Sequence, residues 1–296
     1  MTMNVSELCN VNDQTIIRLR LLLLLFISSA LTLSSSFVQA DGKLLGTAGA
    51  SPVEGGGGGG LIPWAMLAGY ATQDEWAGVA AVSHTDMTDF RMNSLSVAAN
   101  YHDRVELSFG RIDFRSKAGG DVTRQNVAGL KVRLLGDLIY GDEPVVSVGV
   151  QYKSLLDTDT ARASGAKDTT GTDFYVSAAR VWLDGLVDRT VLLNANLRNT
   201  EANQLGLLGF GGDEGGREWL FEGAAAVYLD RYWAVGVEYR EKPDNLSALR
   251  EEDWAGIFVA YFPSKSVSVT AAYLNLGDVA GESNQSGMYL STQGSF

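Results

Sequence analysis

The stretch Val146-Ser147-Val148-Gly149-Val150-Gln151-Tyr152-Lys153 alternates apolar and polar side chains along its whole length. Successive side chains of a β-strand point to opposite faces, so the stretch predicts a strand with one apolar and one polar face. Such a strand is typical of a membrane barrel, in which the apolar face meets lipid and the polar face lines the lumen. A soluble periplasmic β-protein is the alternative for the same pattern.

This period of two recurs along the chain. Further alternating stretches are 105–109, 130–134, 193–198, 233–240 and 267–273, and less regular candidate strands are 61–71, 75–83, 90–101, 104–115, 173–183, 217–229, 253–262 and 287–296. Most have about 9–11 residues, the length that a tilted strand needs to cross the hydrocarbon layer. In 104–115 the alternation changes parity after Phe109, which predicts a bulge near Gly110.

The connections between these strands alternate in length. Short ones fall near 72–74, 102–103, 184–189, 230–232 and 263–265, and longer ones at 85–89, 116–121, 154–172, 200–216, 241–252 and 276–286. The connection 136–144 is the one exception, because the alternation calls for a short turn there and the connection is longer. Short periplasmic turns that alternate with longer extracellular loops are typical of an up-and-down outer-membrane barrel. A terminal Phe296 at the periplasmic rim keeps this order throughout.

The number of strands depends on the N-terminal region. Counting from residue 61 gives thirteen strands, whereas bacterial barrels favour even numbers. Either 43–51 is a first strand, which gives fourteen, or 61–71 lies outside the wall, which gives twelve; we favour fourteen. The sequence thus predicts an all-β, transmembrane antiparallel up-and-down barrel of 12–14 strands. The Gly-rich segment 41–60 is either the first strand or a plug in the lumen, and 61–296 is the barrel.

The first forty residues read as a cleaved signal peptide. Arg18 and Arg20 precede an apolar run of 13 residues, Leu21–Leu33, and Val38-Gln39-Ala40 supplies small residues for cleavage. This run is shorter than the ~20 residues of a transmembrane helix. Glu7 and Asp13 lie in the long stretch before the run, which suggests a start codon further in. The prediction is export to the outer membrane of a Gram-negative bacterium.

Composition excludes several classes of function. The only cysteine, Cys9, is lost with the signal peptide, so the mature chain has no thiol for disulfides, metal sites or catalysis. A net charge of −12 argues against nucleic acid as a partner. A mean hydropathy of +0.01 fits a barrel with alternating faces. We expect no cofactor and no metal.

Several motifs resemble an uncharacterised proteobacterial family of outer-membrane barrels that is known only as a domain of unknown function. They are Gly42-Lys43-Leu44-Leu45-Gly46, Val53-Glu54-Gly55 through Leu61-Ile62-Pro63-Trp64, Ala68-Gly69-Tyr70, Asp89-Phe90-Arg91, Asp103-Arg104-Val105-Glu106-Leu107-Ser108, Gly129-Leu130-Lys131-Val132-Arg133 and Val150-Gln151-Tyr152-Lys153. The resemblance spans most of 42–296. It implies the barrel and its location but assigns no catalytic residue.

Two features could suggest chemistry. The run Gly55–Gly60 lacks the strand, helix and acidic residue of a dinucleotide fingerprint, so a turn or plug is favoured. His84 is a remote candidate for the general base of a membrane-embedded hydrolase. The neighbouring Ser83 points to the opposite face of a strand and is therefore a poor nucleophile for it. The chain is predicted not to be an enzyme.

Charged side chains on the polar faces are the candidate lining of the lumen. Charge facing lipid would cost about 2–4 kcal/mol at mid-depth for a basic residue, so alternation places these side chains inside. The set is Glu106, Arg111, Asp113, Arg115, Lys131, Arg133, Lys153, Arg180, Arg198, Glu218, Glu222, Glu238 and Arg240. The set can form a selective field across a pore, or a closed network of ion pairs that fills a small barrel.

The predicted function is a porin-like channel for small hydrophilic solutes. The alternative is a closed structural or adhesive barrel whose acidic loops bind ions, lipopolysaccharide or a partner. Those loops carry Asp157, Asp159, Asp168, Asp173, Asp213, Glu214 and the run Glu251-Glu252-Asp253. Outer-membrane lipid and lipopolysaccharide are the expected partners, together with the outer-membrane assembly machinery, which would read Phe296 in the last strand.

Overall fold

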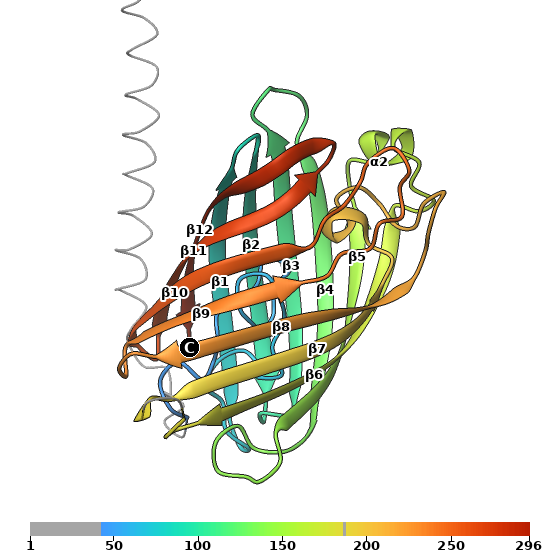
Figure 1. Ribbon diagram of the computed structural model, residues 1–296. Coiled ribbons are helices and arrows are strands. Elements are labelled where there is room, and N and C mark those ends of the chain that lie inside the picture. The colour runs from blue at the N-terminus through green and yellow to red at the C-terminus, as the bar shows by residue number, and fades with distance from the viewer. Residues whose placement is uncertain (1–42, 186–187) are drawn as a thin grey trace, which may run out of the picture. The chain divides into compact units, whose positions relative to one another are not determined.

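A computed structural model describes residues 43–185 and 188–296, and the predicted signal peptide lies outside them. The strands form one closed antiparallel barrel in which every strand pairs with its sequence neighbours and β1 pairs with β12 (Figure 1). The twelve strands are β1 (Trp76–Met87), β2 (Phe90–Tyr101), β3 (Val105–Ser116), β4 (Thr123–Leu135), β5 (Val145–Leu155), β6 (Thr170–Trp182), β7 (Val191–Thr200), β8 (Glu218–Tyr228), β9 (Trp233–Arg240), β10 (Trp254–Ser264), β11 (Val267–Val279) and β12 (Glu282–Ser295). The predicted fold class is confirmed, with twelve strands and not the favoured fourteen.

Alternation of burial along each strand separates the two faces of the wall. In β2 the pattern is strictly alternating, with Ser94, Ser96 and Ala98 buried inside and Leu95 and Val97 exposed outside. The exposed aromatic side chains include Trp76, Trp182, Trp219, Trp233 and Phe296. Apolar side chains that stay exposed on the outer face of a closed barrel match a lipid-facing surface flanked by aromatic rings.

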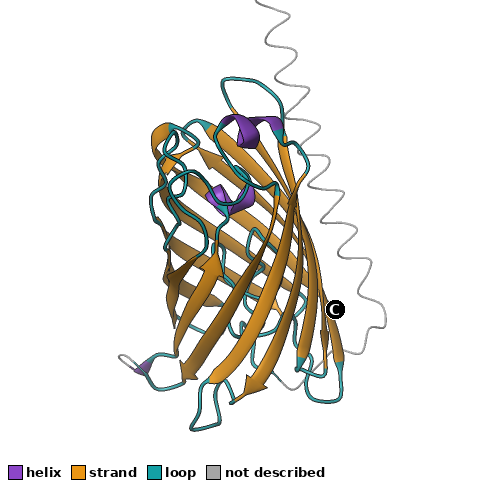
Figure 2. Ribbon diagram, turned by 90° about the vertical axis from the view of Figure 1, so that its right-hand side faces the viewer, coloured by secondary structure: helices purple, strands orange, loops and turns teal. Residues whose placement is uncertain are grey.

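The two rims differ in their connections. One rim, called here the short-turn rim, carries the turns after β2, β4, β6, β8 and β10, together with Trp76 and Phe296. The opposite, long-loop rim carries the loops 156–169, 201–217 and 241–253 (Figure 2). The prediction of a long connection at 276–286 is wrong, because β11 and β12 continue to a tight turn at Ala280 and Gly281. The two turn residues have positive φ values, 52° at Ala280 and 87° at Gly281, and glycine adopts such a conformation at no steric cost.

Two helical turns belong to the loops of the long-loop rim. The α-helix α2 (Asp159–Ala163) lies in the β5–β6 loop, and the 3-10 helix η2 (Asn203–Gly206) lies in the β7–β8 loop. Within 43–185 and 188–296, no helix is long and apolar enough to cross a membrane.

Residues 43–75 form no wall strand. The wall begins at Trp76, so neither 43–51 nor 61–71 contributes a strand, although each was a candidate. Every residue from 46 to 71 is buried. The segment coils inside the barrel in the half nearer the short-turn rim (Figure 1). The stretch from Leu61 to Ala68 is buried on all sides, so its residues are apolar throughout and show no alternation with polar residues, in contrast to the wall strands.

Candidate functional site

The segment 43–75, called the plug below, enters and leaves the lumen at the same rim. Lys43 pairs with Asp103 of the β2–β3 turn at 2.6 Å, and Asp103 also accepts from Arg133. At the other end, the carbonyl of Glu75 accepts from the backbone N–H of His102 in the same turn at 2.9 Å. The plug is therefore an inserted loop whose two ends lie beside one turn.

Close backbone approach explains the glycine run. The backbone of Gly58 exchanges two hydrogen bonds with that of Ala50, at 2.7 and 2.8 Å. A Cβ on Gly58 would lie 2.4 Å from the carbonyl oxygen of Ile62, and one on Gly59 would lie 1.7 Å from Oε1 of Glu238. Residues with a side chain cannot occupy these positions without displacing the backbone or the wall carboxylate. The run therefore builds a compact plug rather than a phosphate-binding loop.

One wall ion pair holds the middle of the plug. The carboxylate of Glu106 accepts from the backbone N–H groups of Gly57 and Ala68 at 3.1 and 2.6 Å. Beside it, Nζ of Lys131 donates to the carbonyls of Gly57 and Met66 at 2.7 and 3.0 Å. Lys131 and Glu106 also pair with each other at 3.3 Å. Both side chains are buried, and each forms hydrogen bonds with the backbone of the plug.

Polar side chains on the opposite wall complete the contact. Glu238 accepts from the backbone N–H groups of Gly60 and Leu61 at 2.8 and 3.0 Å and from the indole N–H of Trp64 at 3.2 Å. Asn194 accepts from the backbone N–H of Ala65 at 2.9 Å. The wall thus satisfies plug groups that would otherwise be buried without partners.

Five adjacent strands contribute a row of charges with alternating sign, called the charge row. From β5 to β9 its members are Lys153, Asp173, Arg198, Glu222 and Arg240. Lys153 pairs with Asp173 at 2.6 Å, Arg198 with Asp173 at 3.1 Å and with Glu222 at 2.7 Å, and Arg240 with Glu222 at 3.2 Å. All five side chains are buried.

Glu54 of the plug joins the two ends of the charge row. Its carboxylate pairs with Arg240 at 2.6 Å, with Lys153, and more distantly with Arg198 at 3.9 Å. Burial alone would raise the pKa of the Glu54 carboxyl, but the attraction of Arg240, Lys153 and Arg198 outweighs it and holds the pKa well below the ordinary value. Glu54 is therefore ionised in the closed lumen.

The long-loop half of the lumen is filled by a second segment. Residues 202–212 of the β7–β8 loop are all buried, including Leu205, Leu207 and Phe210. Leu205 and Leu207 belong to an apolar cluster with wall residues such as Met92, Ile112 and Leu276. Figure 2 shows this loop turned into the barrel. The lumen is thus occupied from both rims.

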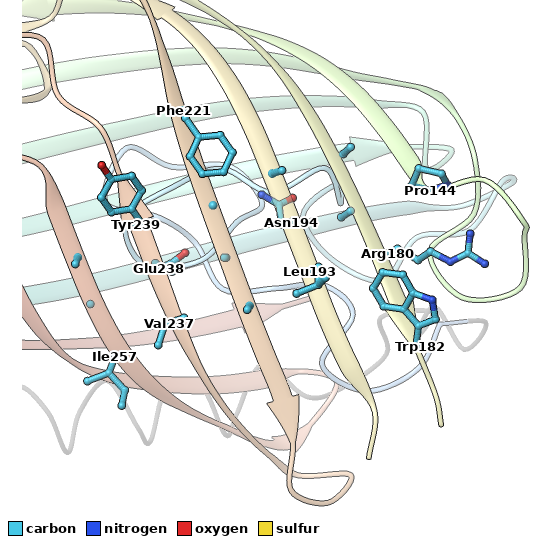
Figure 3. A pocket seen from close by; sticks show the side chains of 18 of the residues that line it. Pro144, Arg180, Trp182, Leu193, Asn194, Phe221, Val237, Glu238, Tyr239 and Ile257 are labelled. Atoms are coloured by element: carbon cyan, nitrogen blue, oxygen red, sulfur yellow. The ribbon is translucent and has the colours of Figure 1, made fainter. Parts of the chain in front are cut away.

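Two small cavities lie between the wall and the inserted segments of the described chain. They have volumes of about 20 Å³ each and lie beside the plug and beside η2. A water molecule needs roughly 10–15 Å³ measured in this way, so each cavity has room for about one water. A groove of about 800 Å³ lies on the outer surface of β6–β11, where Leu193, Phe221, Val237 and Ile257 point away from the lumen (Figure 3). The observed state offers no room for a solute in these cavities.

The structure places seven of the thirteen candidate lumen residues in buried, inward positions. They are Glu106, Lys131, Lys153, Arg198, Glu222, Glu238 and Arg240. Arg133 faces inward at the short-turn rim, where it contacts Asp103. Glu218 begins β8 and is exposed at the long-loop rim.

Arg111, Asp113 and Arg115 lie on the outer face, contrary to the prediction. The pairing of β3 with β2 and β4 runs through Gly110 without a bulge, so these three share the face of Phe109. Arg111 and Asp113 are 40% and 45% exposed and pair at 3.3 Å. The apolar band on this strand ends at Phe109, and beyond it the outer face is polar. A change in environment was misread as a change in parity.

Arg180 is also on the outer face. It shares the exposed side of β6 with Trp182 and lies over that ring at 5.6 Å. Its guanidinium donates to the carbonyls of Gly141 and Asp142 in the longish turn 136–144. A rim position of this kind lets a basic side chain face outward without entering the apolar layer.

Two members of the site were missed by the sequence reasoning. Asp173 was counted with the acidic residues in or beside the longest loop, although it has the same parity as Ser177 in β6 and is the second member of the charge row. Glu54 was quoted only as part of a family motif. Its signal is composition, because it is the one acidic residue between positions 42 and 73.

His84 lies outside the lumen. It is exposed on the outer face of β1, and its Nδ1 is 2.7 Å from Oδ1 of Asn93. Ser83 points inward, where its hydroxyl contacts that of Ser94 at 2.7 Å. The two side chains occupy opposite faces of the wall.

The fold and the lumen define a β-barrel of the outer-membrane type. The chain belongs to the family described as "Protein of unknown function (DUF3034)", whose model matches residues 47–293. No curated protein matches the sequence.

Solved structures with a similar fold include three outer-membrane barrels. The NanC porin has a TM-score of 0.50 and 10% identity, and the match covers 73% of this chain and 98% of that one. For the KdgM porin the values are 0.48, 10%, 74% and 99%. For the outer membrane protein Omp33 of Acinetobacter baumannii they are 0.47, 8%, 76% and 100%. At these identities the likeness concerns the fold alone.

Proposed function

We propose that the protein is a porin-like channel for small hydrophilic solutes in the outer membrane of a Gram-negative bacterium, and that it rests closed. The observation that carries the proposal is the way in which the lumen is filled. Many inward side chains of the wall are small or polar, among them Ala81, Ser96, Ser147, Ala226 and Thr270, and larger ones such as Phe258 and Tyr289 pack against the plug. They leave a wide lumen, which an inserted segment occupies.

The insertion is reversible in principle. Both ends of the plug lie beside the β2–β3 turn, so the plug can withdraw through the short-turn rim without threading through the wall. A barrel built only for rigidity would fill its core with side chains of its own strands. The predicted signal peptide, the apolar outer face and the aromatic rings at the rims support the location.

Planar-bilayer recording tests the channel. The plug-free variant lacks residues 45–71, whose flanks meet at the β2–β3 turn. The loop-trimmed variant lacks 204–208, since Asn203 and Gly209 already hydrogen-bond at 3.0 Å. We expect few conductance steps from the intact protein and regular steps when both segments are removed. Heat-modifiable migration on a gel controls for folding. A folded double variant that shows no steps would overturn the channel.

The second candidate is a closed structural or adhesive barrel. The filled lumen itself favours it, because both halves are occupied and each interior cavity has room for about one water. The loops supply further acidic side chains, but several are already paired, such as Asp157 with Arg124 at 2.7 Å and Glu251 with Lys242 at 2.5 Å. Normal envelope integrity in cells that carry the double deletion would count against this candidate.

A further inference from the structure

The charge row carries one positive charge more than negative. Lys153, Arg198 and Arg240 supply three cations, whereas Asp173 and Glu222 supply two carboxylates. The sign alternates strictly, so the row begins and ends with a cation. All five side chains are buried, where an uncompensated charge is strongly unfavourable.

Glu54 supplies the missing anion. It bridges Lys153 and Arg240, the two ends of the row, and turns the row into a neutral ring of six alternating charges. Glu54 is the only acidic residue of the buried stretch 46–71, whereas Asp74 and Glu75 lie at the end of the plug beside the short-turn rim. The wall is therefore built to bind one carboxylate, and in the closed state the protein provides it from its own chain.

We propose that the charge row is a binding site for a solute carboxylate, which competes with Glu54 and thereby favours release of the plug. The inference rests on the proposed channel and names its substrate class, small hydrophilic organic acids. Arg240 offers a guanidinium to one carboxylate oxygen, and Lys153 offers an ammonium to the other, the charge-assisted geometry that such groups favour.

The surrounding groups match a hydroxylated acid. Two amide side chains already contact the row. Gln151 accepts a hydrogen bond from Arg198 at 2.8 Å, and Asn196 donates one to Glu222 at 2.9 Å. The carbonyl of Leu61, which accepts from Arg240 at 2.9 Å, leaves with the plug and frees that donor. A departing plug thus exposes charged donors together with amide groups that can bind hydroxyls.

Block of the open channel by glucuronate tests the site, with glucose as the uncharged match. The recordings use the double variant that lacks residues 45–71 and 204–208. We expect glucuronate to reduce the current at a concentration at least about tenfold lower than glucose, the effect of one charge-assisted contact. Arg240→Gln removes the surplus cation and should abolish this difference. Arg115→Gln, the same change on the outer face, should keep it.

The outcomes separate the two proposals. If the channel conducts but glucuronate and glucose act alike, the carboxylate site is wrong and the channel stands. A difference that survives Arg240→Gln also overturns the site. If the folded double variant does not conduct, the channel is wrong, and the solute site that depends on it falls too.

Discussion

The plug and the β7–β8 loop fill opposite halves of one lumen, and both bury apolar side chains there, such as Ile62 and Leu205. They differ in their contacts with charged side chains. Charged groups of the wall bind the plug backbone, as in the contacts of Glu106 with Gly57 and Ala68. The loop backbone is bound by Glu251 of the neighbouring β9–β10 loop, through the N–H of Gln204. Contacts with wall charges can be exchanged for water or for a charged solute, whereas apolar burial cannot. The comparison identifies the plug as the segment with which a charged solute can compete.

Gly58→Val should have the largest effect, because it acts on the plug by direct overlap with the backbone. Even the first side-chain carbon would lie 2.4 Å from the carbonyl oxygen of Ile62 and 2.9 Å from Cα of Pro63. We expect the variant plug to stay out of the lumen and to be cleaved by a protease added from the short-turn side. Gly216→Val is the control, because nothing lies within 4 Å of a Cβ there. Equal resistance of both variants would contradict the close packing of the glycine run.

Glu54→Gln should weaken the plug without changing its shape. The substitution leaves the charge row with one uncompensated cation, and loss of one partner from a buried ion pair costs about 3–5 kcal/mol. Hydrogen exchange of residues 46–71 should accelerate, whereas exchange of 202–212 should not change. The account is wrong about Glu54 if both segments keep their wild-type protection.

Leu205→Ala makes the reciprocal test on the loop. A buried leucine replaced by alanine costs about 2–5 kcal/mol. Leu205 has a φ of 65°, but alanine keeps the Cβ that makes this conformation unfavourable, so the substitution removes packing without relieving backbone strain. Exchange should rise in 202–212 alone. Acceleration in the plug as well would show that the two segments close the lumen as one unit.

Acid should have the smallest effect of the four changes, and it should reduce the exchange protection of the plug before that of the β7–β8 loop. The pKa of Glu54 is lowered in the closed state, so its contribution is complete above the ordinary value of 4.5 and is lost only as pH falls further. In the half of the lumen that the β7–β8 loop fills, Glu251 accepts a hydrogen bond from the backbone N–H of Gln204 at 2.8 Å, and burial raises the pKa of its carboxyl. A raised pKa means that the closed loop favours the protonated carboxyl, so acidification stabilises the closed loop. Below about pH 4.5, where the Glu54 contribution begins to be lost, the plug should therefore lose protection first. Earlier opening of the loop would contradict this assignment.

Sequence reasoning succeeded where a residue faces one environment along a whole strand. The alternation around Lys153 and Arg198 was enough to place both inside, because lipid excludes charge from the other face. It failed at boundaries. On β3 the lipid layer ends at Phe109, and a strand that continues into water carries Arg111 outside without any change of pairing.

The plug was predictable only as an alternative. Its stretch 61–71 resembles a strand in composition, and a single sequence does not state which wall residues a buried segment will meet. The ring that Glu54 closes depends on Lys153 and Arg240, which are 99 and 186 positions away. Such contacts follow from barrel closure, which sets five strands side by side, and not from any local pattern.

A pair of introduced cysteines tests the position of the plug most directly. A Cβ at Gly55 would lie 3.3 Å from that of Ser96 on the inner face of β2, close to the ~3.5–4.5 Å of a disulfide, and the bond must offset the backbone strain of a cysteine at the φ of 86° of Gly55. Cys9 is the only cysteine of the chain and lies in the predicted signal peptide. The account predicts that Gly55→Cys with Ser96→Cys forms a disulfide in the exported protein, whereas Gly55→Cys with Leu95→Cys, on the outer face, does not. Free thiols in the first pair, or equal cross-linking in both, would contradict a plug inside the lumen.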